Sequence, residues 1–212
     1  MEDTPGPGLR ERKKRETRDE LSRAAVELVG ERGWAAVTID DIAARAGVAP
    51  RTFRNYFPTK AAAISGRHVD RMRRVAEALA ALPADVPLLP GLLDRVLAEF
   101  AQSGPGAPPP DPARIAAVRL MLAEPALQGE LARAGALARD ELAAAVAART
   151  GTDPEREIYP HLVAAAVDSA VDVAITHCLG AARPVPLVPV LRDALERLTA
   201  GLAVPPAPEE QP

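Results

Sequence analysis

Apolar residues recur along most of this chain at steps of three and four, which is the spacing of one face of an α-helix. The pattern predicts helices near 12–32, 38–46, 50–57, 59–82, 88–102, 112–123, 125–150, 154–181 and 187–203. Alternating runs that would indicate strands are almost absent. Proline lacks a backbone N–H and clashes with the preceding helical turn, so proline clusters separate these segments. The sequence therefore predicts an all-α fold.

Residues that start and stop helices bound the first three predicted helices. Gly33 follows the first helix, where a residue able to adopt positive φ is common. Thr38 precedes the second helix, and Asp41 completes a pair resembling a capping box. Gly47 supplies a tight turn, and Pro50 occupies the first turn of the third helix, where its missing N–H costs nothing. The two short helices joined by glycine have the dimensions of a helix-turn-helix.

Composition supports a globular helical protein and gives no sign of catalysis. Hydrophobic residues make up 48% of the 212 residues and aromatic residues 3%, so packing depends on Ala, Leu and Val. The single cysteine, Cys178, excludes an intrachain disulfide and is expected to be a small buried hydrophobe. No catalytic Ser/His/Asp set, paired acid, metal motif or phosphate loop is recognisable. We expect no enzymatic activity, no metal and no cofactor.

The charge is divided unevenly along the chain. Residues 1–74 hold 16 Lys/Arg against 11 Asp/Glu, a net of +5, and residues 75–212 hold 10 against 18, a net of −8. A basic end joined to an acidic body indicates that one part meets a polyanion, although a solvated charged face would give the same balance. The polar N-terminus and the absence of about 18 uninterrupted apolar residues indicate a cytoplasmic protein without a membrane partner.

The third predicted helix carries side chains suited to reading DNA. Arginine can bond bidentately to guanine and asparagine to adenine in the major groove. Phe53 and Phe57 are expected to anchor this helix to the helices behind it. The alternative is an ordinary helical hairpin with a solvated polar face. The polar positions are Arg51, Thr52, Arg54 and Asn55.

The stretch from Gly8 to Ile64 resembles the N-terminal domain of the TetR/AcrR repressor family. The matching pieces are ERGW at 31–34, TIDDIAARAGV at 38–48 and TFRNYFPTK at 52–60. This resemblance implies a three-helix, helix-turn-helix DNA-binding domain followed by a C-terminal helical domain for effector binding and dimerisation. The expected divisions are a disordered 1–9, the DNA-binding domain at 10–58, the helical domain at 59–204 and a disordered tail at 205–212, with a proline-rich loop at 104–111.

The resemblance also implies particular DNA contacts. Phosphate contacts are implied for Thr38, Tyr56 and Lys60. Groove contacts are implied for Pro50, Arg51, Thr52, Arg54 and Asn55, with Arg45 as a further contact. The family often has an aromatic residue or glycine near the positions of Arg54 and Arg51, so direct base reading by these two arginines stays open. The stretch Arg10–Arg18 could enter a minor groove, lie along phosphates or serve only as a solubilising arm.

The C-terminal helices are expected to hold a pocket for an unknown small-molecule effector. The segments 119–131 and 148–179 resemble the branch containing the mycofactocin-type regulators. This resemblance would allow acyl-CoA-like effectors, although the sequence contains no recognisable acyl-CoA-binding motif. Apolar candidates for the pocket could equally be core, and the polar ones could face solvent. His161 and His177 lie too far apart along one helix to form a metal site. The pocket candidates are Leu93, Leu97, Phe100, Met121, Leu122, His161 and Asp168.

The last two predicted helices are expected to form a homodimer interface. Small residues on the first permit close helix approach, and leucines on the second form an apolar stripe. The alternative is a helix pair within one monomer. The interface candidates are Ala166, Ala170, Ala174, Leu191, Leu195 and Leu198.

These observations predict a TetR-type repressor that a small-molecule effector releases from a pseudo-palindromic, double-stranded DNA operator. The helix beginning at Thr59 is expected to act as the lever between effector and DNA. An activator, or a ligand-independent DNA-binding protein of the same fold, is the alternative.

Overall fold

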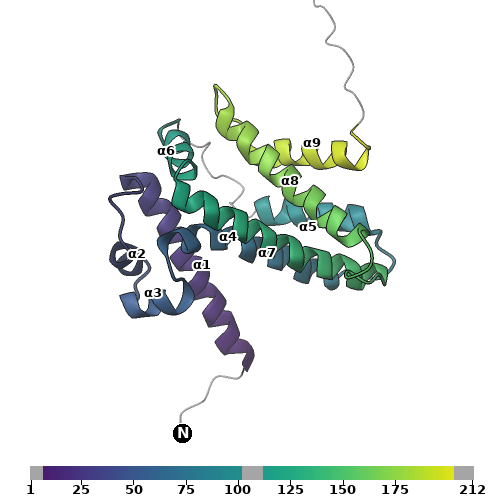
Figure 1. Ribbon diagram of the computed structural model, residues 1–212, viewed down its shortest axis with the longest axis horizontal. Coiled ribbons are helices and arrows are strands. Elements are labelled where there is room, and N and C mark those ends of the chain that lie inside the picture. Colours follow the sequence, from purple (N-terminus) through teal and green to yellow (C-terminus); the bar gives the residue numbers. More distant parts are fainter. Residues whose placement is uncertain (1–6, 102–111, 203–212) are drawn as a thin grey trace, which may run out of the picture. The chain divides into compact units, whose positions relative to one another are not determined.

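The computed structural model describes residues 7–101 and 112–202, and the regular secondary structure within them is entirely helical (Figure 1). This confirms the all-α prediction. The predicted 104–111 loop, residues 1–6 and the tail beyond Leu202 lie outside the described residues. The helices are α1 (Pro7–Arg32), α2 (Ile39–Arg45), α3 (Pro50–Tyr56), α4 (Lys60–Ala80), α5 (Leu88–Ala101), α6 (Pro112–Leu122), α7 (Pro125–Thr150), α8 (Tyr159–Gly180) and α9 (Leu187–Thr199).

Two helices begin several residues away from the expected positions. α1 starts at Pro7 rather than near residue 12, so residues 7–9, which were expected to be disordered, are helical. Its first turns have no apolar stripe, but an i,i+4 ion pair joins Arg12 and Glu16 at 3.5 Å. α8 starts at Tyr159 rather than near 154, because the preceding residues form a turn in which the Asp153 carboxylate accepts from the Glu155 amide at 2.9 Å.

The chain divides into two compact units, and the first contains the helix-turn-helix. Its described residues run to Arg73 and resume from 112 to Ala138. Within it α1 packs against α2 and α6, and α2 packs against α3. This division differs from the expected domain boundary at 58, because α6 and the start of α7 pack with the N-terminal helices. The largest fully buried side chains of its core are Leu21, Leu28, Ile42, Phe53, Phe57 and Leu127.

The second unit comprises the described residues from Arg74 to Ala101 and from Arg139 to Leu202. In it α9 packs against α8 and α5. The Arg149 guanidinium near the end of α7 donates to the carbonyl oxygens of Leu82, Pro83 and Val86 at 2.7, 2.5 and 2.7 Å. One side chain thus fixes the whole α4–α5 connection.

Among the described residues, α8 is long and apolar enough to cross a membrane by length and composition alone. A single helix of this kind is weak evidence for a membrane protein. One face of α8 packs against α9, and its Asp168 forms an ion pair with Arg139 at 2.7 Å. These contacts are those of a helix packed within a helical domain.

Candidate nucleic-acid interface

The turn between α2 and α3 has the form expected of a helix-turn-helix. The Thr38 hydroxyl accepts from the Asp41 amide at 3.1 Å, and the Asp41 carboxylate accepts from the Thr38 amide at 2.9 Å. This is the predicted capping box, and the hydrogen bond from the Thr38 side chain lowers the pKa of Asp41. Gly47 has a φ of +68°, and Pro50 opens α3. The predicted local geometry is therefore confirmed.

Two phenylalanines hold α3 in place. A helix of seven residues is not stable alone in water, so packing must supply its stability. The side chains of Phe53 and Phe57 are 0% and 2% exposed, and their ring centroids lie 5.9 Å apart. A Cβ atom on Gly66 of α4 would lie 2.7 Å from Cε1 of Phe57. The missing side chain lets the ring approach α4 closely, and the predicted anchoring role of both rings is confirmed.

A partly buried ion pair supports the C-terminal end of α3. Nε of Arg18 donates to Oδ2 of Asp70 at 2.7 Å, and Nη1 donates to the Tyr56 carbonyl at 3.2 Å. The same guanidinium lies 4.3 Å from the centroid of the Phe57 ring. The Asp70 side chain is 8% exposed and also accepts from Arg73 at 3.1 Å. α1, the end of α3 and α4 therefore meet at one guanidinium.

The sequence pattern alone does not identify this ion pair. The available signal was the position of Arg18, three residues before Leu21, which begins the buried stripe of α1 that continues through Ala25 and Leu28. A charged residue on a buried helix face implies a charged partner. The identity of that partner, 52 residues away, required the structure.

The outer face of α3 is open. The side chains of Arg51, Arg54 and Asn55 are exposed, and those of Pro50 and Thr52 are half-buried. Within the described residues, no hydrogen bond or ion pair engages the two arginines or Asn55. Five predicted groove contacts therefore lie on one short helix, and three of them present side chains directly to solvent.

Two predicted DNA contacts are engaged inside the N-terminal unit instead. The Lys60 ammonium donates to the carbonyls of Trp34 and of Val37, the latter at 2.7 Å, and lies 4.2 Å from the Trp34 ring centroid. Burial lowers the pKa of Lys60. Arg45 donates two hydrogen bonds to the Glu31 carboxylate at 3.2 and 2.8 Å, which raises the pKa of Arg45. Both cations link α1 or the loop after it to the next helices, and their DNA contacts stay predictions.

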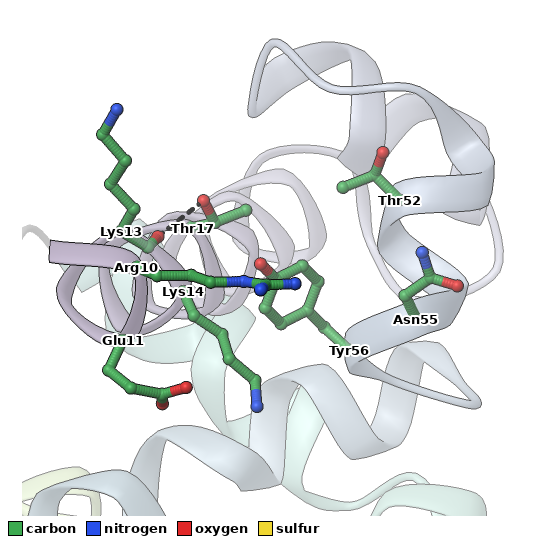
Figure 2. Close-up of a pocket in the computed structure, with 8 residues that line it drawn as sticks. All are labelled: Arg10, Glu11, Lys13, Lys14, Thr17, Thr52, Asn55 and Tyr56. Atoms are coloured by element: carbon green, nitrogen blue, oxygen red, sulfur yellow. Dashed lines mark hydrogen bonds between the residues drawn. The ribbon is translucent and has the colours of Figure 1, made fainter. Parts of the chain in front are cut away.

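A groove of about 890 Å³ separates the first turns of α1 from α3 (Figure 2). From α1 it is lined by Arg10, Glu11, Lys13, Lys14 and Thr17. From α3 it is lined by Thr52, Asn55 and Tyr56. Because Arg10–Arg18 is helical, this stretch is not an extended arm of the kind that enters a minor groove.

The predicted pocket residues belong to both units of the chain. Leu93 and Leu97 line a depression of about 380 Å³ between α5 and α9, and Phe100 is buried in the same unit. Met121 and Leu122 instead pack into the core of the N-terminal unit. The predicted pocket set therefore spans both units, and a shared pocket stays a prediction.

The two polar pocket candidates are engaged locally. His161 is exposed, and its Nε2 lies 2.8 Å from the Pro154 carbonyl oxygen. Asp168 pairs with Arg139, and its side chain is 18% exposed. His161 thus contacts the segment before α8, and Asp168 links α8 to α7. Neither residue lines the depression at Leu93 and Leu97.

The predicted dimer residues divide into buried and accessible ones. Leu191 and Leu195 are 0% and 1% exposed in the single chain, because α9 turns this stripe toward α5 and α8. They are therefore not available to a second copy. Ala170 and Ala174 are also buried, whereas Ala166 and Leu198 are half-buried.

A different apolar surface is exposed on the same two helices. Leu162 and Val173 of α8 are 55% and 61% exposed. Together with Ala166 and Ser169 they follow steps of four, three and four, so they lie on one face. Val173 and Leu198 also line a mainly apolar depression of about 540 Å³ between α8 and α9. This surface has the character of a protein contact.

Comparison with known proteins gives matches over both parts of the chain. The family model "Bacterial regulatory proteins, tetR family" matches residues 21–63, and "MftR C-terminal domain" matches residues 86–203. The chain is 34% identical over 171 residues to the HTH-type transcriptional regulator TcmR of Streptomyces glaucescens, a match covering 76% of this chain and 72% of TcmR.

Solved structures show the same fold at low sequence identity. The fatty acid degradation regulator FadR of Bacillus halodurans has a TM-score of 0.55 at 17% identity, covering 96% of this chain and 100% of FadR. The repressor FadR of Thermus thermophilus, solved in complex with lauroyl-CoA, has a TM-score of 0.52 at 21% identity, covering 92% of this chain and 100% of that one.

Proposed function

The chain belongs to the TetR family of bacterial transcriptional regulators, with an MftR-type C-terminal domain, and on that premise we propose that it is a repressor released from a pseudo-palindromic operator by a small-molecule effector. Proteins of this family are DNA-binding regulators rather than enzymes. The observation that carries the proposal is the outer face of α3, where Arg51, Arg54 and Asn55 are exposed on a helix anchored by Phe53 and Phe57.

The proposed repressor acts as a homodimer in the cytoplasm. Two copies present their α3 helices to major grooves about one DNA turn, roughly 34 Å, apart. We propose that the contact uses the exposed face of α8, with Leu162, Ala166 and Val173, and the half-buried Leu198 of α9. Ala166 and Leu198 are retained from the sequence-based set, whereas Leu191 and Leu195 are assigned to the core.

The proposed effector is a small molecule that binds the C-terminal domain and favours a conformation with lower affinity for DNA. The depression at Leu93 and Leu97 is the candidate entrance to its site. An acyl-CoA-like compound is one candidate class, because the Thermus thermophilus FadR was solved with lauroyl-CoA. Screening acyl-CoA compounds for release of the protein from DNA tests this class.

The test of the proposed function begins with selection of DNA duplexes from a random-sequence pool by the purified protein. Arg51→Ala and Asn55→Ala are each expected to weaken binding to the selected duplex by about 1 to 3 kcal/mol, because each removes a candidate base contact. Fluorescence anisotropy titrations measure the change.

Arg133→Ala is the matched control for these two variants. Arg133 is an exposed arginine on α7 that pairs with Glu130 at 3.0 Å, far along the chain from α3. Its removal is expected to leave DNA affinity unchanged. If both α3 variants bind as tightly as the unaltered protein, the assigned recognition surface is wrong.

Val173→Glu is expected to weaken dimerisation at least tenfold, since a carboxylate would be removed from water without a partner in the contact. Sedimentation velocity across a concentration series measures this. Leu89→Glu, at an apolar residue that is 37% exposed on α5, is the control and should leave the dimer intact. A dimer that persists in the Val173 variant would remove the outer face of α8 from the interface.

A further inference from the structure

The groove between α1 and α3 joins a basic helix face to the recognition helix. Arg10, Lys13, Lys14 and Thr17 stand at positions i, i+3, i+4 and i+7, so they share one face of α1. On α3, Thr52, Asn55 and Tyr56 stand at i, i+3 and i+4 and form the opposite wall. Figure 2 shows Arg10 and Lys14 extending from α1 into the space between the helices.

The charge of this groove is available to a ligand. Three cations and one carboxylate, Glu11, line it, which leaves an excess of positive charge. Within the described residues, no hydrogen bond or ion pair engages Arg10 or Lys14. Arg45 and Lys60, by contrast, are held by Glu31 and by backbone carbonyls. The accessible cations of the N-terminal unit therefore include Arg10 and Lys14 on this face of α1, beside the polar face of α3.

We propose that one sugar-phosphate strand of the operator lies in this groove, with Arg10 and Lys14 contacting its phosphates. This inference rests on the proposed function and adds a second DNA-binding element to it. From residue 10 to residue 17 the helix rises about 10.5 Å, at roughly 1.5 Å per residue. This face is therefore long enough for Arg10 and Lys14, about one helical turn apart, to contact different phosphates of the same strand.

The two walls have different roles in this arrangement. Phosphates carry no base identity, so the α1 wall supplies affinity without sequence preference. The α3 wall offers the hydroxyl groups of Thr52 and Tyr56 toward the same strand and places Asn55 where α3 reads base edges. Loss of the α1 cations should therefore weaken binding to every duplex equally, and loss of Asn55 should weaken binding to the selected duplex only.

The first experiment compares the double variant Arg10→Ala/Lys14→Ala with the single variant Arg12→Ala. Arg12 lies on the same helix, pairs with Glu16 and does not line the groove, so it controls for the loss of an arginine from α1. The probes are the selected duplex and a random duplex of equal length. Affinity is measured between about 50 and 200 mM salt, the range over which phosphate contacts change binding most visibly.

The double variant is expected to lose at least tenfold in affinity for both probes at the higher salt. Two phosphate contacts in each protomer make four in the dimer, so the slope of log affinity against log salt should become shallower by about 3 to 4. Arg12→Ala should change the slope by less than one. A slope in the double variant equal to that of the unaltered protein would overturn the inference.

The second experiment follows the chemical labelling of the few lysine side chains in the protein. The chain has three lysines, Lys13, Lys14 and Lys60. Reductive methylation followed by mass spectrometry is expected to label Lys13 and Lys14 quickly and Lys60 slowly, because the Lys60 ammonium bonds two carbonyls. The selected duplex should slow labelling of Lys14 at least fivefold. Equal labelling rates with and without the duplex would also overturn the inference.

The two proposals fail in distinguishable ways. If the purified protein selects no sequence and binds neither duplex, the proposed function is wrong. If it binds the selected duplex and Asn55→Ala weakens that binding, but the double variant and the labelling rate of Lys14 are unchanged, the function stands and the groove is not a DNA site.

Discussion

Truncation of Phe53 to alanine is expected to destabilise the N-terminal unit by about 3 to 5 kcal/mol and to abolish DNA binding. The ring is fully buried and stands beside Phe57, so its loss leaves a cavity in addition to the lost apolar transfer energy. α3 has seven residues and no stability of its own, so losing its main anchor releases the recognition helix. Urea denaturation followed by far-ultraviolet circular dichroism measures the first effect, and anisotropy with the selected duplex measures the second.

The matched truncation is Leu120→Ala. Leu120 belongs to α6 in the same unit, but its side chain is 73% exposed. Its truncation therefore leaves no cavity and should change the free energy of unfolding by less than about 0.5 kcal/mol. If the Phe53 variant unfolds at the same urea concentration as the Leu120 variant, then α3 is not held by this ring.

Replacement of Asp70 by alanine is expected to cost about 2 to 4 kcal/mol. The carboxylate is 8% exposed and its main partner Arg18 is 28% exposed, so the change leaves a largely desolvated guanidinium without its counter-ion. Because Arg18 also holds the Tyr56 carbonyl and covers the Phe57 ring, DNA affinity should fall along with stability. Urea denaturation measures the change in stability, and fluorescence anisotropy measures the change in DNA affinity.

A second substitution separates the lost pair from general damage. Adding Arg18→Met to the Asp70 variant removes the unpaired charge and should recover part of the lost stability. Glu20→Ala, which breaks an exposed pair with Arg23, should cost less than about 1 kcal/mol. An Asp70 variant no less stable than the Glu20 variant would show that the network contributes little.

Local signals in the sequence were sufficient for the helix-turn-helix. Thr38, Gly47 and Pro50 act on their immediate neighbours, and the capping box, the positive φ and the helix start occur where these residues predict them. The apolar period also identified Phe53 and Phe57 as anchors. These features depend on interactions within a few residues, which residue type and spacing describe well.

The tertiary partners of individual charged side chains could not be predicted in the same way. Arg45 and Lys60 have the residue types of phosphate contacts, but Glu31 and the carbonyls of the α1–α2 loop satisfy them. Glu31 is 14 residues from Arg45, and Val37 is 23 residues from Lys60. Whether a cationic side chain is engaged by partners within the protein depends on such tertiary contacts. The pattern of residues along the sequence does not show these contacts.

Periodicity also identifies which residues share a helix face without identifying what covers that face. Leu191 and Leu195 share a stripe, as expected, but α5 and α8 of the same chain cover it. Met121 is buried in the core of the first unit, whereas Leu93 is half-buried and belongs to the second unit. The elements were thus predictable, whereas their partners were not.

The contact between the Lys60 ammonium and the ring of Trp34 makes part of this protein visible by intrinsic fluorescence. Trp34 is the chain's one tryptophan, so its emission arises from the first unit alone. Loss of the cation above the indole and entry of water should shift that emission when α1 separates from α4. Emission during denaturation therefore reports a single unit, and a midpoint different from that of total ellipticity would reveal that the two units melt independently.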